Sequence, residues 1–343
     1  MIRGIDVGPV SAWLSDNIAG AAGPFQFELI AGGRSNLTFR VTDINGTVVV
    51  LRRPPMGHVL ATAHDMAREF RIIDAIGRGS NVPVAPALGL CTDAEVNGSS
   101  FYVMGFVDGV VLDSPSKADE LPREMRRPAS EHLIDVLADL HDVDIDEVGL
   151  GNLAKREGYI VRQLKRWTMQ WENSKTRELP EIDEVGRRLH ERIPEQQGVA
   201  IAHGDYRFGN CLTDVSTGRI AAVLDWELCT LGDPLADVGY LGVYWTDPGV
   251  SSRRPNDPSG GDSGFPTYRS LLDRYALSTG RDLTDIDFYV AFSSWRLAVI
   301  SEGVYNRYLH GAMGDDGSID LGPLKHGTET LAKSALEALD RLH

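Results

Sequence analysis

The chain has 343 residues, of which 42% are hydrophobic and 24% charged, and its formal net charge is -15. A chain of this length can bury a large core and is long for one domain, so we expect a globular protein with two lobes. Its negative charge opposes binding to nucleic acid or to an anionic membrane, because both partners need a basic surface.

The amino terminus has no basic segment followed by an apolar run, so nothing indicates export. No uninterrupted apolar run reaches the length that spans a membrane. The three cysteines, Cys91, Cys211 and Cys229, form no Cys-x-x-Cys pair, which argues against a disulfide framework or a zinc site. We therefore predict a cytoplasmic protein. The sequence does not indicate an oligomeric state.

The first hundred residues alternate short apolar segments with turn residues, which is the pattern of a β-sheet. The pair Asn45-Gly46 between two β-branched segments is a strong hairpin signal. Between residues 61 and 79, apolar side chains recur at helical spacing. We predict an N-terminal lobe, residues 1–105, with a five-stranded antiparallel sheet and one helix inserted after the third strand. The predicted strands cover residues 25–30, 37–42, 48–53, 87–93 and 99–107.

From about Pro128 onward the pattern is mostly helical, with short strands expected in the stretches 201–214 and 220–241. Residues 246–266 form a long Gly/Ser/Pro/Asp-rich segment, and such loops are usually functional lids or disordered. We predict a larger helical lobe, residues 106–343, and an α+β fold for the chain. The predicted helices cover residues 130–143, 158–174, 179–193, 268–280, 286–309 and 324–342.

A group of polar residues follows a short apolar segment in the second lobe: His203, Asp205, Arg207 and Asn210. Asp225 follows at the end of the next predicted strand. Phosphoryl transfer needs a carboxylate that accepts or orients the proton of an attacking hydroxyl, and oxygen ligands that hold Mg²⁺ against the phosphates. Carboxylate and amide oxygens suit Mg²⁺ better than zinc. The spacing His-x-Asp-x4-Asn is that of the kinase catalytic loop, so the pattern favours a kinase.

The sequence resembles the aminoglycoside phosphotransferase family of small-molecule kinases. The likeness rests on "AGGRSNLTFRV", "HGDYRFGN", "VLDWELCTLGDPLADVGYL" and "SSWRLAVISEGVYNRYL", and so covers nearly the whole chain. It is strongest to the branch that includes kinase-like domains fused ahead of acyl-CoA dehydrogenases in some eukaryotic proteins. The resemblance implies a protein-kinase-like two-lobe fold, with ATP and Mg²⁺ as cofactors.

By this resemblance Asp205 is the catalytic base, Asn210 and Asp225 are the Mg²⁺ ligands, and His203 braces the loop. The residues alone leave other roles open. His203 can be a buried scaffold residue, Asn210 a turn residue and Asp225 a strand-end cap. Arg207 either contacts a phosphate or pairs with a neighbouring acid.

The nucleotide-binding lobe departs from the family, because residues 1–105 contain no lysine. Family members hold the nucleotide phosphates with a lysine on the third strand, paired with a glutamate in the following helix. Arg52 aligns with that lysine and Glu69 with the glutamate, so we predict that this pair replaces it, rather than one formed by Arg53. Arginine keeps its charge but presents a different donor geometry. The alternative is a surface ion pair that contributes little.

The turn between the first two strands would cover the phosphates, although it lacks the Gly-x-Gly-x-x-Gly pattern and a plain hairpin turn is the alternative. At the end of the fifth strand, backbone groups of Met104 and Phe106 would meet the adenine edge. The turn residues that we predict to contact the nucleotide are Gly32, Gly33, Ser35 and Asn36.

For the acceptor, we expect a hydroxyl on a small molecule. Asp233 and Pro234 indicate a further helix start, with Asp as N-cap and Pro in the first turn. The short run from Asp225 to this helix leaves almost no room for the long segment with which protein kinases present peptides. Arg296, Arg307 and Lys325 favour an acidic acceptor, and the related branch implies a hydroxylated acid or acyl thioester. Arg253 and Arg254 would reach such a group from the 246–266 loop. The net charge of -14 on the second lobe argues instead for a cationic acceptor, so an aminoglycoside kinase is the alternative.

Two other classes stay open. The missing lysine allows a pseudokinase module that binds nucleotide without turnover. A metal-dependent phosphohydrolase could use His203, Asp205, Asp225 and Asp237, but it leaves the N-terminal lobe without a purpose. By the family resemblance Asp237 instead anchors the backbone of the catalytic loop.

Overall fold

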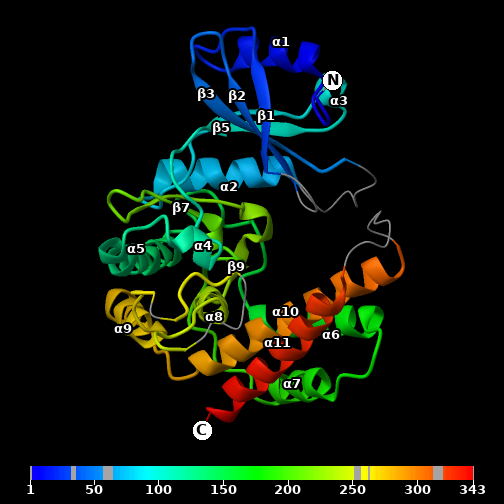
Figure 1. Cartoon of the computed structure of the whole chain (residues 1–343), viewed down its shortest axis with the longest axis vertical. Helices are drawn as coiled ribbons and strands as arrows, with labels where there is room; N and C mark the ends of the chain where they lie inside the picture. The colour runs from blue at the N-terminus through cyan, green and yellow to red at the C-terminus, as the bar shows by residue number, and fades with distance from the viewer. Residues whose placement is uncertain are drawn as a thin grey trace.

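The computed structural model of the protein describes residues 2–31, 36–56, 65–250, 256–261, 263–311 and 320–342. A β-sheet forms one end of the molecule and helices form the other (Figure 1). In chain order the elements are α1 (Val7–Asn17), β1 (Gln26–Ala31), β2 (Leu37–Thr42), β3 (Val48–Arg53), α2 (Met66–Gly79), β4 (Ala87–Cys91), α3 (Ala94–Asn97), β5 (Phe101–Gly105), α4 (Pro115–Ala118), α5 (Arg123–His141), α6 (Tyr159–Ser174), α7 (Pro180–Glu191), β6 (Ala200–Ala202), η1 (Phe208–Asn210), β7 (Cys211–Thr213), β8 (Ile220–Val223), η2 (Trp226–Leu228), β9 (Thr230–Gly232), α8 (Leu235–Val243), α9 (Tyr268–Thr279), α10 (Ile286–Leu309) and α11 (Gly322–Asp340).

The N-terminal sheet has the strand order β1-β2-β3-β5-β4, and every neighbouring pair is antiparallel. In this register Arg52 of β3 lies opposite Thr38 on one side and Tyr102 on the other. The helix α2 follows the third strand. The predicted five-stranded antiparallel sheet with one inserted helix is therefore confirmed.

Helices cover the two faces of this sheet, with α1 on the outer side and α2 between the sheet and the helical part (Figure 1). Val10 and Leu14 of α1 belong to a small core with sheet residues such as Phe39, whereas Ile73 and Ile76 of α2 belong to the large core of the helical part. The sequence did not predict α1, because Gly, Pro, Ser, Asp and Asn interrupt it and only two of its side chains are buried.

The helical part is organised around α10, which packs against α6, α7, α8 and α11. The side chains of α10 are buried on most sides of the helix, as expected of a central helix. Two small antiparallel pairs, β6 with β9 and β7 with β8, lie among the helices. They place residues 203–210 and 224–229 at the side of the helical part that faces the sheet.

The predicted α+β class is confirmed, and the six predicted helices of the second lobe are present. The start of one was predicted wrongly: α5 begins at Arg123 and not at residue 130, and it contains Pro128. The three cysteines are free and buried. Among the described residues, no helix is long and apolar enough to cross a membrane.

Candidate active site

The loop that carries His203 and Asp205 is held by a buried carboxylate. Asp237, in the first turn of α8, accepts hydrogen bonds from the backbone N–H of His203 (2.6 Å) and of Gly204 (2.8 Å). His141, at the end of α5, places Nε2 3.4 Å from the same carboxylate. Burial alone would raise the pKa of Asp237, but the contacts with His141, His203 and the Gly204 N–H hold it below its ordinary value of 3.8. Asp237 therefore stays ionised and fixes the start of the loop.

His203 is fully buried, and both of its ring nitrogens are used within the loop. Nδ1 accepts from the N–H of Asp205 (3.2 Å), and Nε2 donates to the carbonyl of Leu224 (2.8 Å). These two contacts assign the neutral Nε2–H tautomer. His203 and Asp237 therefore have no free atom for a metal ion, which removes two of the four ligands that a phosphohydrolase would need.

Asp205 and Arg207 lie together at the end of this loop. Arg207 Nε is 3.5 Å from Asp205 Oδ1, and the Arg207 guanidinium lies 4.9 Å from the centre of the Tyr244 ring. Asp205 Oδ1 and two nitrogens of Arg207, Nε and Nη1, make no hydrogen bond to the described residues. The Asp205 carboxylate and the Arg207 guanidinium thus lie side by side, and each has atoms that can still form hydrogen bonds.

The hairpin β7–β8 brings Asn210 and Asp225 to the same end. Cys211 pairs with Val223, and the N–H of Leu224 donates to the carbonyl of Asn210 (2.8 Å). The side-chain amide of Asn210 donates to the carbonyl of Asp205 (2.8 Å), which leaves its Oδ1 as the atom that can accept.

Asp225 has left-handed backbone angles, φ 63° and ψ 65°. It is the one non-glycine residue with positive φ in the described part of the chain. Such a conformation is uncommon but is tolerated better by Asp than by most side chains.

The donor set formed by Asn210 and Asp225 fits Mg²⁺. It offers one amide oxygen and one carboxylate, and within the described ranges no group of three His, Cys, Asp or Glu side chains could hold a metal ion alone. Mg²⁺ bound with nucleotide takes only one or two carboxylates from the protein and its other ligands from phosphates and water. The residues present therefore match a metal that arrives with a phosphate chain.

Arg52 extends from β3 into the same region. Its Nε lies 3.0 Å from Glu69 Oε2 and its Nη2 2.5 Å from Asp225 Oδ1. Tyr102 also donates to Glu69 Oε2 (3.1 Å), and Asn36 donates to Glu69 Oε1 (3.0 Å). Burial would lower the pKa of Arg52, but Glu69, Tyr102 and Asp225 raise it above its ordinary value. The guanidinium thus joins the sheet, α2 and the segment after β8.

Residues 26–271 match the profile of the phosphotransferase enzyme family. The chain belongs to this family. The resemblance predicted from the sequence is therefore confirmed. Among curated relatives, mouse acyl-CoA dehydrogenase family member 10 is 34% identical to this phosphotransferase over 318 residues, which cover 92% of the chain and 29% of the relative. The phosphotransferase spans between 29% and 43% of the length of the curated relatives that it matches.

Solved structures share its fold. A Ralstonia eutropha protein, assigned provisionally as an aminoglycoside phosphotransferase, is 32% identical, with a TM-score of 0.82 over 98% of this chain and 99% of that one. Choline kinase from Cryptosporidium parvum is 14% identical, with a TM-score of 0.65 over 98% and 96% of the two chains. The second likeness concerns the fold alone. Together they confirm the predicted kinase-like two-lobe fold.

The side chain of Arg53 lies on the opposite face of β3 from that of Arg52. Its guanidinium contacts the carbonyls of Gly4 and Asn97, and its Nε donates to the carbonyl of Pro54 (3.1 Å). All three acceptors are uncharged backbone groups on the outer side of the sheet. The alternation of β3 thus separates the two arginines, and only Arg52 meets Glu69.

Replacing Arg52 by alanine should raise KM for ATP far more than replacing Arg53, because only Arg52 lies beside Glu69 and Asp225. We expect a rise of about 10- to 100-fold for Arg52→Ala, the usual loss for one charge-assisted contact, and partial retention in Arg52→Lys. The measurement is ATP titration at saturating Mg²⁺, with Arg53→Ala as the matched control. Equal losses at both positions would show that the charge at 52 has no special role.

The nucleotide-contacting residues predicted in the turn lie partly outside the described residues. Gly32, Gly33 and Ser35 fall there, while Asn36 is buried and donates to Glu69 as given above. At the end of β5, the ring of Phe106 lies 5.0 Å from the Arg40 guanidinium carbon.

Met104 pairs with β3 and β4 within the sheet, and the N–H of Gly105 donates a hydrogen bond to the carbonyl of Pro86 (2.8 Å). Adenine contacts at Met104 and Phe106 stay predictions.

A cavity of about 690 Å³ opens beside the catalytic loop, between α2, α6 and α10. Gly204 and Arg296 line it next to the loop, and Arg68, Arg166 and Trp167 line it further out. Of the basic residues that the sequence suggested for acceptor binding, Arg296 reaches this cavity, whereas Arg307 and Lys325 do not line it. Arg253 and Arg254 lie outside the described residues.

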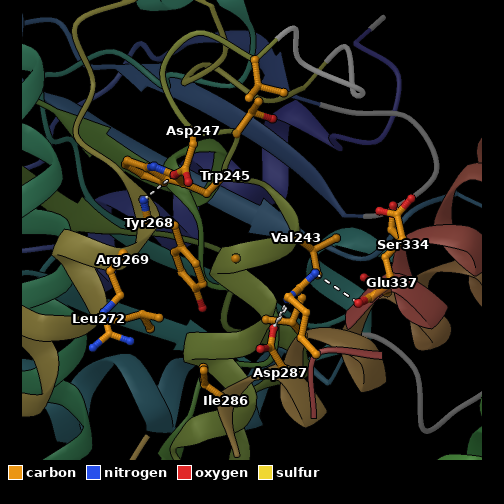
Figure 2. Close-up of a pocket in the computed structure, with 16 residues that line it drawn as sticks. Val243, Trp245, Asp247, Tyr268, Arg269, Leu272, Ile286, Asp287, Ser334 and Glu337 are labelled. Atoms are coloured by element: carbon orange, nitrogen blue, oxygen red, sulfur yellow. Dashed lines mark hydrogen bonds and ion pairs between the residues drawn. The ribbon is translucent and has the colours of Figure 1, made fainter. Parts of the chain in front are cut away.

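A second cavity, of about 620 Å³, lies between α8, α9, α10 and α11 (Figure 2). None of the predicted site residues lines it. Its charged side chains are used locally: Arg341 pairs with Asp287 (2.5 Å), and Asp247 accepts from the backbone N–H of Tyr268 (2.7 Å). Of these two cavities, only the one beside the catalytic loop is lined by the predicted site residues Glu69 and Arg296.

Several residues at the site were not predicted from the sequence, among them Tyr102, Arg68 and Arg166. Tyr102 lies on β5 opposite Arg52, and the alternation of that strand could have indicated it. Arg68 lies next to Glu69 in sequence and donates to the carbonyl of Cys229. Arg166 is an exposed residue of α6 at the outer part of the cavity, and nothing in the spacing of α6 distinguishes it from other exposed residues.

Proposed function

We propose that this phosphotransferase transfers the γ-phosphate of ATP, in the presence of Mg²⁺, to a hydroxyl group of a small molecule. The observation that carries the proposal is the carboxylate of Asp205, whose Oδ1 has no hydrogen-bond partner among the described residues, on a loop shared with Asn210. Arg52, Glu69 and Asp225 lie joined on the nucleotide side. This set matches the parts that phosphoryl transfer requires.

Each residue then has a chemical role. Asp205 orients the acceptor hydroxyl and takes its proton as the oxygen attacks the γ-phosphorus, and the bond to the bridging oxygen of ADP breaks. Arg52, held by Glu69, would bind the nucleotide phosphates, and Arg207 would face charge on the transferred group. Bound through Asn210 and Asp225, Mg²⁺ would offset the negative charge of the phosphates.

The acceptor in this proposal is a hydroxy acid or a hydroxyacyl-CoA. Three arginines line the cavity beside the loop, and their guanidinium groups contact carbonyls or a ring instead of carboxylates: Arg68 with Cys229, Arg296 with Gly204, and Arg166 with the ring of Trp167. Three carboxylates also line this cavity, but Glu69 pairs with Arg52, Glu227 accepts from Asn36 (3.4 Å) and Asp65 accepts from the N–H of Arg68 at the start of α2. A polycationic aminoglycoside would meet carboxylates that already have partners, which is unfavourable.

Only residues 226–234 separate Asp225 from α8, so the platform that a protein acceptor needs is short. This observation supports a small molecule as the acceptor.

Hydroxy acids should be phosphorylated and kanamycin should not. The protein is incubated with ATP and Mg²⁺ and with 3-hydroxybutyrate, 3-hydroxyoctanoate, their CoA thioesters or kanamycin. ADP release is followed, and the phosphate is located by mass spectrometry. We expect acceptor-dependent ADP release with an acid or its thioester, and none after chelation of Mg²⁺. Turnover of kanamycin alone would overturn the acceptor class, and ATP binding without ADP release would favour a pseudokinase.

A further inference from the structure

We propose that Arg296 binds a carboxylate of the acceptor and thereby selects hydroxy acids whose hydroxyl lies close to the acid group. This inference rests on the proposed phosphotransfer to a small hydroxylated molecule. It assigns the specificity for that acceptor to one side chain of α10.

Arg296 is a buried cation that forms no ion pair with the described residues. Its side chain is only 7% exposed, and its Nη2 donates to the carbonyl of Gly204 (2.6 Å). The guanidinium carbon lies 4.8 Å from the centre of the Tyr240 ring. Within the described part of the chain it forms no ion pair, and its Nε has no hydrogen-bond partner. A buried charge in this condition is costly unless an anion joins it.

The place of Arg296 points to the acceptor and not to the nucleotide. Arg296 lines the 690 Å³ cavity together with Gly204 and Trp167. Arg52 and Asp225 do not line that cavity, whereas Glu69, the partner of Arg52, lines it at the α2 side. Arg296 lies at the opposite side, next to Gly204, so an anion that pairs with Arg296 would lie beside the catalytic loop.

The contact with Gly204 sets the distance between the anion and the reacting hydroxyl. Gly204 directly precedes Asp205, and neighbouring Cα atoms are about 3.8 Å apart. A carboxylate on Arg296 and a hydroxyl on Asp205 would thus belong to neighbouring parts of one small acceptor. The guanidinium can hold both carboxylate oxygens, which fixes direction as well as distance.

The experiment compares wild type with Arg296→Met, Arg296→Lys and Arg307→Met. Arg307 lies in the same helix, is exposed and does not line the cavity, so Arg307→Met controls for loss of an arginine from α10. The probes are 2-, 3-, 4- and 5-hydroxyoctanoate and the uncharged octane-1,3-diol. Thermal unfolding and Mg·ATP affinity of each variant show whether its fold and nucleotide side are intact.

For wild type we expect one or two positional isomers to be preferred and the diol to be a poor acceptor. In Arg296→Met, KM for the preferred acid should rise about 10- to 100-fold, the usual loss for a charge-assisted hydrogen bond, with little change for the diol. Arg296→Lys should recover part of the loss, and Arg307→Met should match wild type. An unchanged preference for acid over diol in Arg296→Met would overturn the inference while leaving phosphotransfer in place.

A binding measurement separates this inference from the proposed function. Calorimetry with the same acids in the presence of Mg²⁺ and a non-hydrolysable ATP analogue does not require turnover. Binding by wild type but not by Arg296→Met would support the carboxylate site even if no phosphate were transferred. Equal binding by both proteins, or binding of none of the acids by wild type, would contradict it.

Discussion

Replacing Asp205 by asparagine should lower kcat by about 10²- to 10⁴-fold, the usual contribution of a general base. The substitution keeps the size of the side chain but removes the group that accepts the proton. Asp205 contributes its N–H to His203 and its carbonyl to Asn210, and both backbone contacts stay available in the variant. The loop should therefore keep its conformation, and ATP affinity should be retained.

The measurement is steady-state kinetics together with direct binding of Mg·ATP. Asp16→Asn makes the same chemical change on an exposed position of α1 and serves as the control. An Asp205→Asn protein with the kcat of wild type would remove Asp205 from the mechanism.

Replacing Asp237 by alanine should reduce the free energy of unfolding by about 3–5 kcal/mol, the usual loss when one partner of a buried charged contact is removed. The backbone N–H groups of His203 and Gly204 would lose their acceptor inside the protein. In any protein that still folds, kcat should also fall, because the loop before Asp205 would no longer be fixed. Denaturant unfolding and kinetics measure the two effects.

Asp237→Asn retains one oxygen and should lose less stability than Asp237→Ala. If Asp237→Ala lowered the free energy of unfolding by less than about 0.5 kcal/mol, as surface substitutions usually do, the anchoring role would be contradicted.

The stability that Asp237 contributes should also depend on pH. Its folded pKa lies below the ordinary value of 3.8. The contribution is then fully present above that value and is lost as the pH falls through the folded pKa. The stability difference between wild type and Asp237→Asn should therefore be constant near neutral pH and shrink in acid below about pH 4. Urea unfolding across this range tests it, and a difference that grows in acid would have the wrong sign.

The sequence predicted the sheet well because its strands carry their own signals. Alternation and the Asn45-Gly46 turn are local, and so is the absence of lysine that pointed to Arg52. Helix α1 carries a weaker signal: Val7, Val10 and Leu14 recur at helical spacing, but Gly8 and Pro9 interrupt them and only Val10 and Leu14 are buried.

Contacts between residues far apart in the sequence could not be predicted from local patterns. Arg296 was visible as a basic residue on a helix, but its position beside Gly204, 92 residues earlier, depends on how α10 crosses the catalytic loop. The role of Asp237 as an anchor came from family resemblance, because no local pattern joins it to residues more than thirty positions earlier.

At position 225, the residue that would best stabilise the backbone differs from the residue that supplies a carboxylate. Left-handed angles cost a non-glycine residue roughly 1–2 kcal/mol, and glycine adopts them freely. A glycine at 225 would relax the chain there and would remove the carboxylate that faces Arg52. The residue that would relax the backbone at position 225 therefore cannot supply the carboxylate that the proposed phosphotransfer needs.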